Sequence, residues 1–375
     1  MFGKVKLETA VRFTTMCTRL SACLAPSTSA SSLEIIRHKV YWWIALCISL
    51  SFSLPIMYDL HLNRDDVNNI MLNMAELCPI CTTTVKLFLC KYNEQKLQAC
   101  VAELEHFVAT ASRRERQLLQ HYVDRCISVH YFMLFCIVST IFGFSSVPIF
   151  LPQPYPTHAT YPFKVETDLM KNMIRAFQIL AIVQTALFVS IDAQFSTLIW
   201  FTGARFELLS EELRKVSNVA QIRACVRKHQ NVLRFAEDVN LLTRFVVSGV
   251  GISTAIGTIC GGIQLLQDVT AMVKARFVSF VMVGALELFT YAWPAEHLVK
   301  ISEDVGYSAY SARWTGQKPE MTNLLFIVMQ RARKPASISV SGFIPMLSLD
   351  FYKSFLSTSF SYFTTLRATT MANTS

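Results

Sequence analysis

Apolar residues are gathered in long segments, and the shorter segments between them hold most of the charged residues. A helix that crosses a bilayer needs about 20 mostly apolar residues. On this pattern we expect spanning helices over residues 38–58, 68–90, 127–150, 169–202, 245–267, 275–299 and 342–367. The second and the seventh are the weakest, because Asn and Glu dilute the first half of one and Ser and Thr are frequent in the other. The pattern predicts an all-α membrane protein with seven transmembrane helices.

The distribution of basic residues predicts how these helices are oriented. Residues 1–39, 86–126, 203–244 and 300–341 hold 27 of the 35 Lys and Arg residues, and segments rich in Lys and Arg remain on the cytoplasmic side. The first apolar segment is longer than the core of a signal peptide and has no clear cleavage site. We therefore expect a cytoplasmic N-terminus over residues 1–37, a retained first span and an extracellular tail. The tail comprises residues 368–375.

Two connections between the spans carry a helical pattern. Apolar residues recur at helical intervals in residues 203–244, and the pattern returns in residues 320–333. This spacing is typical of amphipathic helices. We expect the bundle of residues 38–299 to extend into the cytoplasm, with residues 300–341 as a helical anchor.

The outer connection over residues 151–163 is rich in proline and aromatic residues. Proline stiffens the chain and prevents regular structure. The segment is either a lid over an outer cavity or an ordinary connector, and the sequence favours neither.

Composition supports a membrane protein and argues against other classes. Hydrophobic residues make up 52% of the chain and charged residues 16%, with a mean hydropathy of +0.37, whereas about a quarter of a soluble domain is charged. The net charge of +9 does not indicate nucleic-acid binding, because the basic residues lie between apolar segments rather than on one aromatic-rich face. We expect contact with membrane lipid and no nucleic-acid partner.

The residue types that do chemistry in enzymes are not arranged in a recognisable site. Cys78 and Cys81 have the spacing of a redox pair, but they fall inside an apolar run, so we interpret them as packing residues. The eight histidines include no pair with metal-ligand spacing, and the sequence has no nucleophile–base arrangement or cofactor loop. We therefore expect no metal, no cofactor and no enzymatic activity.

Four acidic residues fall within or at the edge of expected spans, namely Glu76, Asp192, Glu287 and Asp350. Ionisable groups inside a membrane need partners. They could tie helices together, line an ion path or be neutral acids. We favour ties between helices, although the sequence does not show which residues pair.

The last span carries a polar stripe. At 3.6 residues per turn, about 100° of the helix surface contains Ser354, Ser357, Thr358, Ser361, Thr365 and Ala368. One such stripe cannot enclose a pore, but several copies around an axis can. Close packing between helices, for which Ser and Thr are also favoured, is the alternative.

Two groups of residues in the C-terminal part form longer motifs. Residues 342–350 read GFIPMLSLD, residues 358–367 read TSFSYFTTLR, and upstream Tyr291-Ala292-Trp293 precedes Trp314. These motifs resemble the C-terminal signature of the insect odorant receptors, and length and span number agree over the whole chain. The family commonly has Tyr at the position of Phe360, and its obligate co-receptor is longer between spans four and five. The resemblance therefore implies an odorant-tuning subunit.

The resemblance implies a heterotetramer with the odorant co-receptor, which forms an odorant-gated, non-selective cation channel in the plasma membrane of sensory dendrites. The last helix of each subunit would line the pore, in this chain with Ser354, Thr358, Ser361, Thr365, Ala368 and Thr369. By motif position Thr365, Ala368 and Thr369 would lie at the extracellular gate, where the co-receptor has apolar residues. Gating by dewetting would then depend mainly on the partner subunits.

The resemblance also places the ligand cavity in the outer halves of spans two, three, four and six. The candidate residues there are Ile70, Met71, Asn73, Met74, Leu77, Thr140, Ile141, Phe144, Met173, Phe177, Gln178, Phe277, Phe280 and Val281. Small-molecule pockets are mostly apolar with few polar groups, and here Asn73, Thr140 and Gln178 could fix a hydroxyl or a ring N–H. The Phe and Met residues favour a small aromatic volatile such as a phenol or an indole, although each of them could serve packing alone.

Two other classes of membrane protein are alternatives. A G-protein-coupled receptor would have its N-terminus outside and an NPxxY motif in its last span, and the sequence has no such motif. A secondary transporter would have paired broken helices in two related halves. The glycines at 249, 251, 257, 261 and 262 have no counterpart earlier in the chain, and close helix approach explains them better.

Overall fold

The computed structural model describes residues 5–26, 30–150, 153–265, 270–340 and 344–372, with the side chains of Met272 and residues 366–372 outside the description. The helices are α1 (Leu7–Leu20), α2 (Ser32–Leu62), α3 (Val67–Tyr92), α4 (Glu94–Thr110), α5 (Arg113–Ser145), α6 (Val147–Phe150), α7 (Asp168–Leu213), α8 (Val219–Leu265), α9 (Ala271–Tyr310), α10 (Pro319–Ala332) and α11 (Leu349–Ala372). Over these described ranges the fold is all-α, and its one extended pairing is an isolated bridge between Val340 and Ile344.

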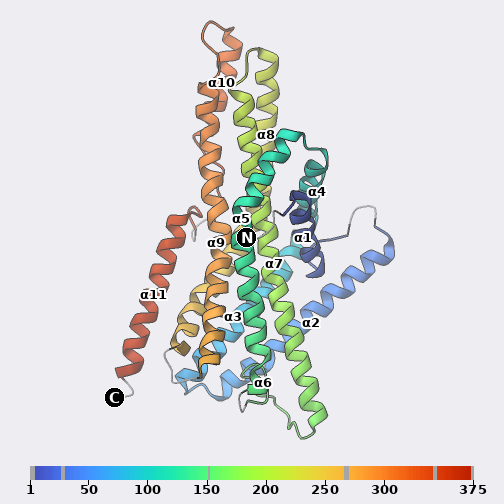
Figure 1. Cartoon of the computed structure of the whole chain (residues 1–375), viewed down its shortest axis with the longest axis vertical. Coiled ribbons are helices and arrows are strands. Elements are labelled where there is room, and N and C mark those ends of the chain that lie inside the picture. The colour runs from blue at the N-terminus through green and yellow to red at the C-terminus, as the bar shows by residue number, and fades with distance from the viewer. Residues whose placement is uncertain (1–4, 27–29, 151–152, 266–269, 341–343, 373–375) are drawn as a thin grey trace.

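The long helices α7, α8 and α9 run side by side along the molecule, with α10 at one end and the connection between α6 and α7 at the other (Figure 1). The seven expected spans lie mainly on α2, α3, α5, α7, α8, α9 and α11 in that order, with the end of the third on the short helix α6, which confirms the seven-helix membrane fold. By length and composition α2, α5, α7, α8 and α9 could cross a membrane. The other two helices, α3 and α11, are the spans expected to be weakest.

The expected amphipathic helices are also present. The segment 203–244 continues α7 to Leu213 and forms the first half of α8, and residues 320–333 coincide closely with α10. Leu213, Ile222 and Val239 are fully buried between these helices. The apolar stripe read from the sequence therefore becomes a packed extension of the bundle.

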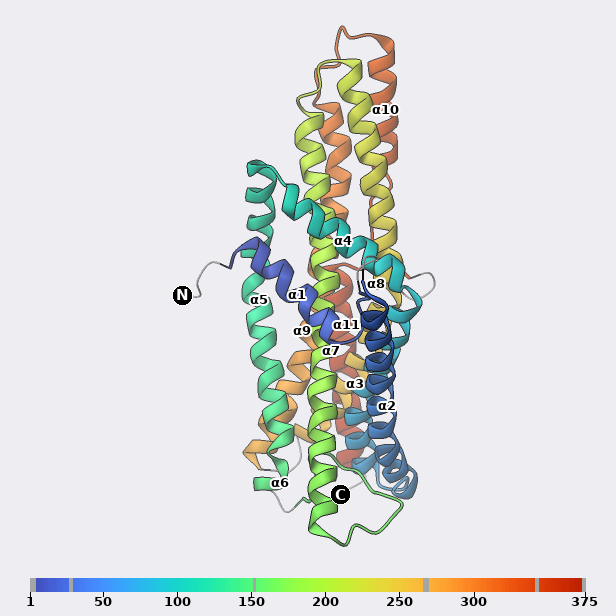
Figure 2. The ribbon, with the colours of Figure 1, turned by 90° about the vertical axis from the view of Figure 1, so that its right-hand side faces the viewer.

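Helices α1 and α4 were not expected from the sequence, and they cross the long helices obliquely (Figure 2). Leu7 and Val11 of α1 are buried, and the α1 amide of Leu7 donates a hydrogen bond to Gln120 Oε1 at 2.9 Å. In α4, Leu97 and Leu104 are buried to about the same degree as the main core. Both helices are short, and their stability comes from packing rather than from propensity.

The last helix begins later than expected. The sequence predicts a span from residue 342, whereas α11 begins at Leu349, where the Ser348 hydroxyl accepts a hydrogen bond from the amide of Phe351 at 3.1 Å. Pro345 precedes this cap in an irregular segment, and proline lacks the amide hydrogen that a helix interior requires. Asp350 therefore lies exposed in the first turn of α11, where a negative charge is favourable to the helix dipole.

A buried ionic cluster joins α3, α7 and α9. The Lys86 ammonium lies 2.6 Å from Asp192 Oδ2 and 2.5 Å from Glu287 Oε1, and the Tyr291 hydroxyl donates to Asp192 Oδ1. The side chains of Lys86 and Asp192 are 3% and 0% exposed. The sequence interpretation counted Lys86 among the loop charges, which is wrong, because the lysine is a partner of two in-span acids. Asp192 and Glu287 are ties between helices, as expected.

Candidate functional site

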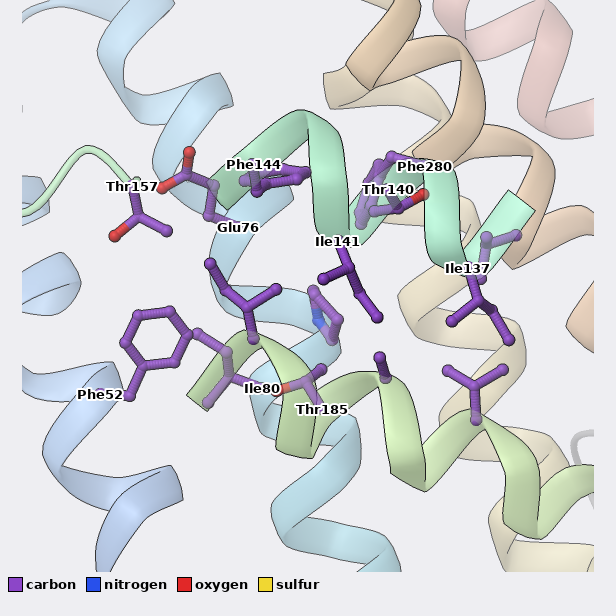
Figure 3. A pocket seen from close by; sticks show the side chains of 15 residues that line it. Phe52, Glu76, Ile80, Ile137, Thr140, Ile141, Phe144, Thr157, Thr185 and Phe280 are labelled. Atoms are coloured by element: carbon purple, nitrogen blue, oxygen red, sulfur yellow. The ribbon is translucent and has the colours of Figure 1, made fainter. Parts of the chain in front are cut away.

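A cavity lies inside the bundle, near the end where residues 153–163 connect α6 to α7 (Figure 3). Its volume is about 100 Å³. It is lined by Phe52 of α2, Glu76, Pro79 and Ile80 of α3, Ile137, Thr140, Ile141 and Phe144 of α5, Thr157 of the connection, Ile182, Thr185, Ala186 and Val189 of α7, and Phe280 and Val283 of α9. Hydrocarbon side chains dominate this lining, so burial of apolar surface is the main attraction that the cavity offers.

The polar side chains around the cavity are already engaged. The hydroxyl of Thr140 donates to the Cys136 carbonyl at 2.8 Å, and the hydroxyl of Thr185 donates to the Ala181 carbonyl at 2.9 Å. Both oxygens keep acceptor lone pairs. The Glu76 carboxylate is turned toward Thr157 and the rim of the cavity (Figure 3), and its Oε2 accepts a hydrogen bond from the amide of His158 at 3.0 Å. The cavity can therefore accept a hydrogen bond from a ligand but has little to donate.

The connection between α6 and α7 covers the cavity at this end of the bundle. The amide and hydroxyl of Thr157 donate to Gln178 Oε1 at 3.2 and 3.1 Å, and the hydroxyl of Thr160 donates to Asp59 Oδ1. Together with the bond from His158 to Glu76, these contacts fasten the segment to α2, α3 and α7. Because Thr157 also lines the cavity, the segment is a lid, one of the two interpretations that its proline pattern allowed.

Small residues and a buried arginine position the two aromatic rings of α5 and α9. A Cβ at Gly257 of α8 would lie 3.2 Å from the ring of Phe280, so glycine makes room for that ring. The Arg276 guanidinium is buried and lies over the ring of Phe144, 4.5 Å from its centroid. A cation over an aromatic face is attracted by the quadrupole of the ring. The contact with Arg276 therefore helps to fix the position of the Phe144 ring.

Four of the predicted ligand residues meet at this cavity, namely Thr140, Ile141, Phe144 and Phe280. The other predicted residues lie elsewhere. Asn73 and Gln178 are buried but serve other groups: Asn73 Nδ2 donates to Asp59 Oδ2 at 2.7 Å, and Gln178 holds the lid. Met173 is 65% exposed and faces away from the bundle.

The remaining predicted ligand residues pack in walls beside the cavity. Met71, Met74 and Phe277 surround the cluster of α3, α8 and α9 that contains Cys260. Leu77 and Phe177 pack between α2, α3 and α7, Val281 faces Gly261, and Ile70 is half-buried on α3. On α7 the cavity is lined by Ile182, Thr185, Ala186 and Val189, all further along the helix than the predicted residues Met173, Phe177 and Gln178. The apolar pattern of a sequence does not show how deep in the bundle a cavity lies. Nothing in the sequence distinguishes Phe52 and Val189, which line the cavity, from other apolar residues in their spans.

The polar stripe of α11 faces away from the rest of the chain. Ser354, Thr358, Ser361 and Thr365 are all exposed, while Phe363 packs against Gly262 and the Tyr352 hydroxyl donates to the Ala285 carbonyl at 3.2 Å. Figure 1 shows α11 at the edge of the bundle. Packing within this chain therefore does not explain the stripe. The side chains of Ala368 and Thr369, also predicted to line a pore, lie outside the described residues.

Among the described residues no group of three or more His, Cys, Asp or Glu is arranged to hold a metal ion. Cys78 is buried and Cys81 is exposed on α3, and each is a free thiol.

Comparison with known sequences gives a consistent picture. Residues 66–360 match the family described as 7tm Odorant receptor. The chain is 24% identical to Odorant receptor Or2 of Anopheles gambiae over 40% of this chain and 39% of that protein. It is 22% identical to Putative odorant receptor 92a of Drosophila melanogaster over 57% and 55% of the two chains, and 20% identical to Odorant receptor 13a of the same species over 90% and 89%. The chain thus spans less than two thirds of the first two relatives.

Comparison with solved structures covers nearly the whole chain. The olfactory receptor OR5 of Machilis hrabei, solved in complex with eugenol, superposes with a TM-score of 0.84 at 17% sequence identity, over 97% of this chain and 98% of that one. A second solved structure of the same receptor gives a TM-score of 0.84 at 16% identity. The fold described above is therefore the fold of that receptor.

Proposed function

The chain belongs to the insect odorant receptor family, and on this premise we propose that it is a tuning subunit that binds a compact volatile and opens a cation channel. Family membership makes the chain a membrane receptor for odorants and not an enzyme, and it supports this interpretation over a G-protein-coupled receptor or a transporter. The observation that carries the proposal is the apolar cavity between α2, α3, α5, α7 and α9.

The cavity suits one small aromatic ring. An apolar cavity of about 150 Å³ accommodates benzene in another protein, and the volume here, about 100 Å³, is of the same order. Phe52, Phe144 and Phe280 offer ring faces and edges, and the oxygens of Thr140 and Thr185 can each accept one hydrogen bond. A phenol O–H or an indole N–H supplies such a donor. The eugenol that the Machilis receptor binds is also a phenol, which supports this ligand class.

The channel is formed with odorant co-receptor subunits as a heterotetramer, and it passes cations without selectivity. The exposed polar stripe of Ser354, Thr358, Ser361 and Thr365 supports this assembly, because several copies around an axis would turn it toward a shared pore. Thr365, Ala368 and Thr369 would stand at the outer gate. The excess of Lys and Arg in residues 1–39 and 203–244 supports a cytoplasmic N-terminus and an extracellular lid. Membership of the odorant receptor family supports residence in the plasma membrane of a sensory dendrite.

The proposal is tested by expressing the chain in cells with and without an odorant co-receptor and recording current during a panel of phenols, indoles and aliphatic volatiles. We expect aromatic-evoked cation current only when both subunits are present. Current evoked without any partner would overturn the heteromeric channel. A co-expressed, surface-exposed receptor that ignores every aromatic in the panel would overturn the ligand class.

A further inference from the structure

We propose that the ligand reaches its cavity sideways, from the hydrocarbon of the bilayer through a groove between α2 and α7, rather than from the water beyond the lid. The inference rests on the proposed function of the cavity as the odorant site. It concerns the path of the ligand: the groove is occupied by the volatile on its way to the cavity.

The groove is a separate hollow of about 390 Å³ on the outside of the bundle. It is lined by Val40, Trp43, Ile44, Cys47, Ile48 and Ser51 of α2 and by Phe177 of α7. These α2 residues belong to the first expected span, and the half of α2 that carries them leans away from the bundle (Figure 1). Val40 is 52% and Trp43 60% exposed. Apolar side chains exposed at this level face lipid tails, so the groove is open to the bilayer.

Two sets of side chains, packed against each other, separate the groove from the cavity. Ile48 and Phe177, which line the groove, pack against the buried cluster that contains Phe52 and Ile80. Phe52 and Ile80 also line the cavity. A compact ligand would therefore pass from one hollow to the other once the rings of Phe52 and Phe177 rotate aside. Side-chain rotations take nanoseconds when the surroundings allow them.

The backbone of α2 is weakened at this point. Pro55 lies inside α2 and has no amide hydrogen for the carbonyl of Ser51, four residues earlier, which is a groove residue. A proline inside a helix is a common site of bending. Between the groove residues Ile44 and Cys47, the Ala45 carbonyl of α2 accepts a hydrogen bond from Gln184 Nε2 at 2.8 Å, whereas the contact of Ile48 with the Phe177 cluster is apolar.

The alternative path, under the lid, crosses polar contacts. Moving the lid means breaking the bonds from Thr157 to Gln178, from His158 to Glu76 and from Thr160 to Asp59. Each of these bonds satisfies a buried polar group, and leaving such a group without a partner is unfavourable. The sideways path passes the apolar contacts of Ile48 and Phe177 and one hydrogen bond between α2 and α7, from Gln184 to the Ala45 carbonyl. An apolar volatile is already concentrated in the bilayer because water excludes it.

The test is a kinetic comparison of two tryptophan variants. Cys47 lines the groove and not the cavity, whereas Cys81 is exposed on α3 outside the groove. Both receptors are expressed with the co-receptor, and current is recorded after rapid application and removal of one active phenol. We expect Cys47→Trp to slow current onset and decay together, by about threefold or more, with the half-maximal concentration at steady state unchanged, because an obstructed path alters both rates equally. Cys81→Trp should match the unaltered receptor.

Two further variants keep the test decisive if Cys47→Trp does not reach the surface. Ser51→Leu should slow both rates in the same way, and Phe177→Ala should speed both rates. Gln178→Leu, which frees the lid, should leave both rates unchanged. Unchanged kinetics in the groove variants, or faster kinetics after freeing the lid, would overturn the sideways path. Absence of any odour-evoked current in the unaltered receptor would instead overturn the proposed function.

Discussion

The Lys86 ammonium and the Asp192 carboxylate lie 2.6 Å apart in the centre of the bundle, with 3% and 0% of their side chains exposed. The pair joins α3 to α7, and Glu287 and Tyr291 extend it to α9. The same stretch of α9 carries Val283 in the cavity wall. Removing charges from water costs several kcal/mol for each ion, and only close partners offset it. The cluster therefore depends on every member being present.

Replacing Lys86 with methionine should destabilise the receptor strongly. The change leaves Asp192 and Glu287 buried beside each other without a cation, and breaking a buried pair in this way costs about 3–5 kcal/mol. We expect loss of surface expression and a lower midpoint of thermal unfolding in detergent. Lys91→Met is the matched control on α3, because Lys91 pairs with Glu94 near the surface and such pairs contribute about 0–1 kcal/mol. Equal midpoints for the two variants would contradict the ionic tie.

Filling the cavity should remove the response to aromatic ligands. Ala186→Phe adds a ring where the ligand ring is proposed to lie, and we expect the half-maximal concentration to rise at least about tenfold, equivalent to about 1.4 kcal/mol of lost binding. Met173→Phe on the same helix is the control, because that side chain is exposed. Surface expression should be similar for both. An unchanged dose–response curve for Ala186→Phe would place the ligand elsewhere.

The lid should loosen when its anchor on α7 is removed. Gln178→Leu deprives the Thr157 amide and hydroxyl of their acceptor, which costs about 1–3 kcal/mol for a buried group. We expect proteases added outside the cell to cut residues 153–163 faster, with the rest of the chain intact. Arg175→Leu, on an exposed position of the same helix that also contacts the connection through the Pro154 carbonyl, should have a smaller effect. Equal cleavage of Gln178→Leu and the unaltered receptor would argue against the anchor.

Acid should weaken the packed extension of the bundle through His229. This residue lies on α8, 16 residues or about 24 Å before the expected span at residue 245. Burial, and then the charge of Arg331, lower its pKa from 6.5 to about 4. A buried histidine that stays neutral contributes its full stability to the folded protein above pH 6.5. This contribution to the free energy of unfolding is lost as the pH falls toward 4. The slope is at most about 1.4 kcal/mol for each pH unit.

The measurement for His229 is the thermal midpoint of the purified receptor between pH 7 and pH 5. His229→Phe keeps an aromatic ring against Phe206, which lies 6.3 Å away between centroids, and removes the titration. Its midpoint should fall less between the two pH values than that of the unaltered receptor. Parallel curves would show that His229 does not contribute.

The packing of α11 against α8 should be sensitive to a single methyl group added on α8. A Cβ at Gly262 would lie 2.9 Å from the ring of Phe363, whereas a Cβ at Gly251 of the same helix meets no other atom within 4 Å. Gly262→Ala should displace α11 and cost about 1–3 kcal/mol, with altered resting or maximal current. Gly251→Ala should be neutral or slightly stabilising, because alanine favours helix by up to about 1 kcal/mol. Identical currents in the two variants would contradict this contact.

The sequence by itself determined the fold class and the seven helices, because apolar length is imposed by the bilayer and can be counted along one chain. It also determined the polar stripe of α11 and the family, through residues that are close together in the chain. It missed α1 and α4, since their stability depends on surfaces that other helices supply. It misplaced the start of α11, because Ser348 and not the apolar pattern sets that end.

Only the tertiary structure decided what the side chains do across the bundle. Lys86 and Glu287 are 201 residues apart in the chain and in contact in the fold, and no local pattern pairs them. The cavity likewise takes residues from five helices and the lid, so its depth depends on how the helices are shifted along one another. Helical periodicity tells which face of a helix is buried, but the neighbour on that face is set by packing alone.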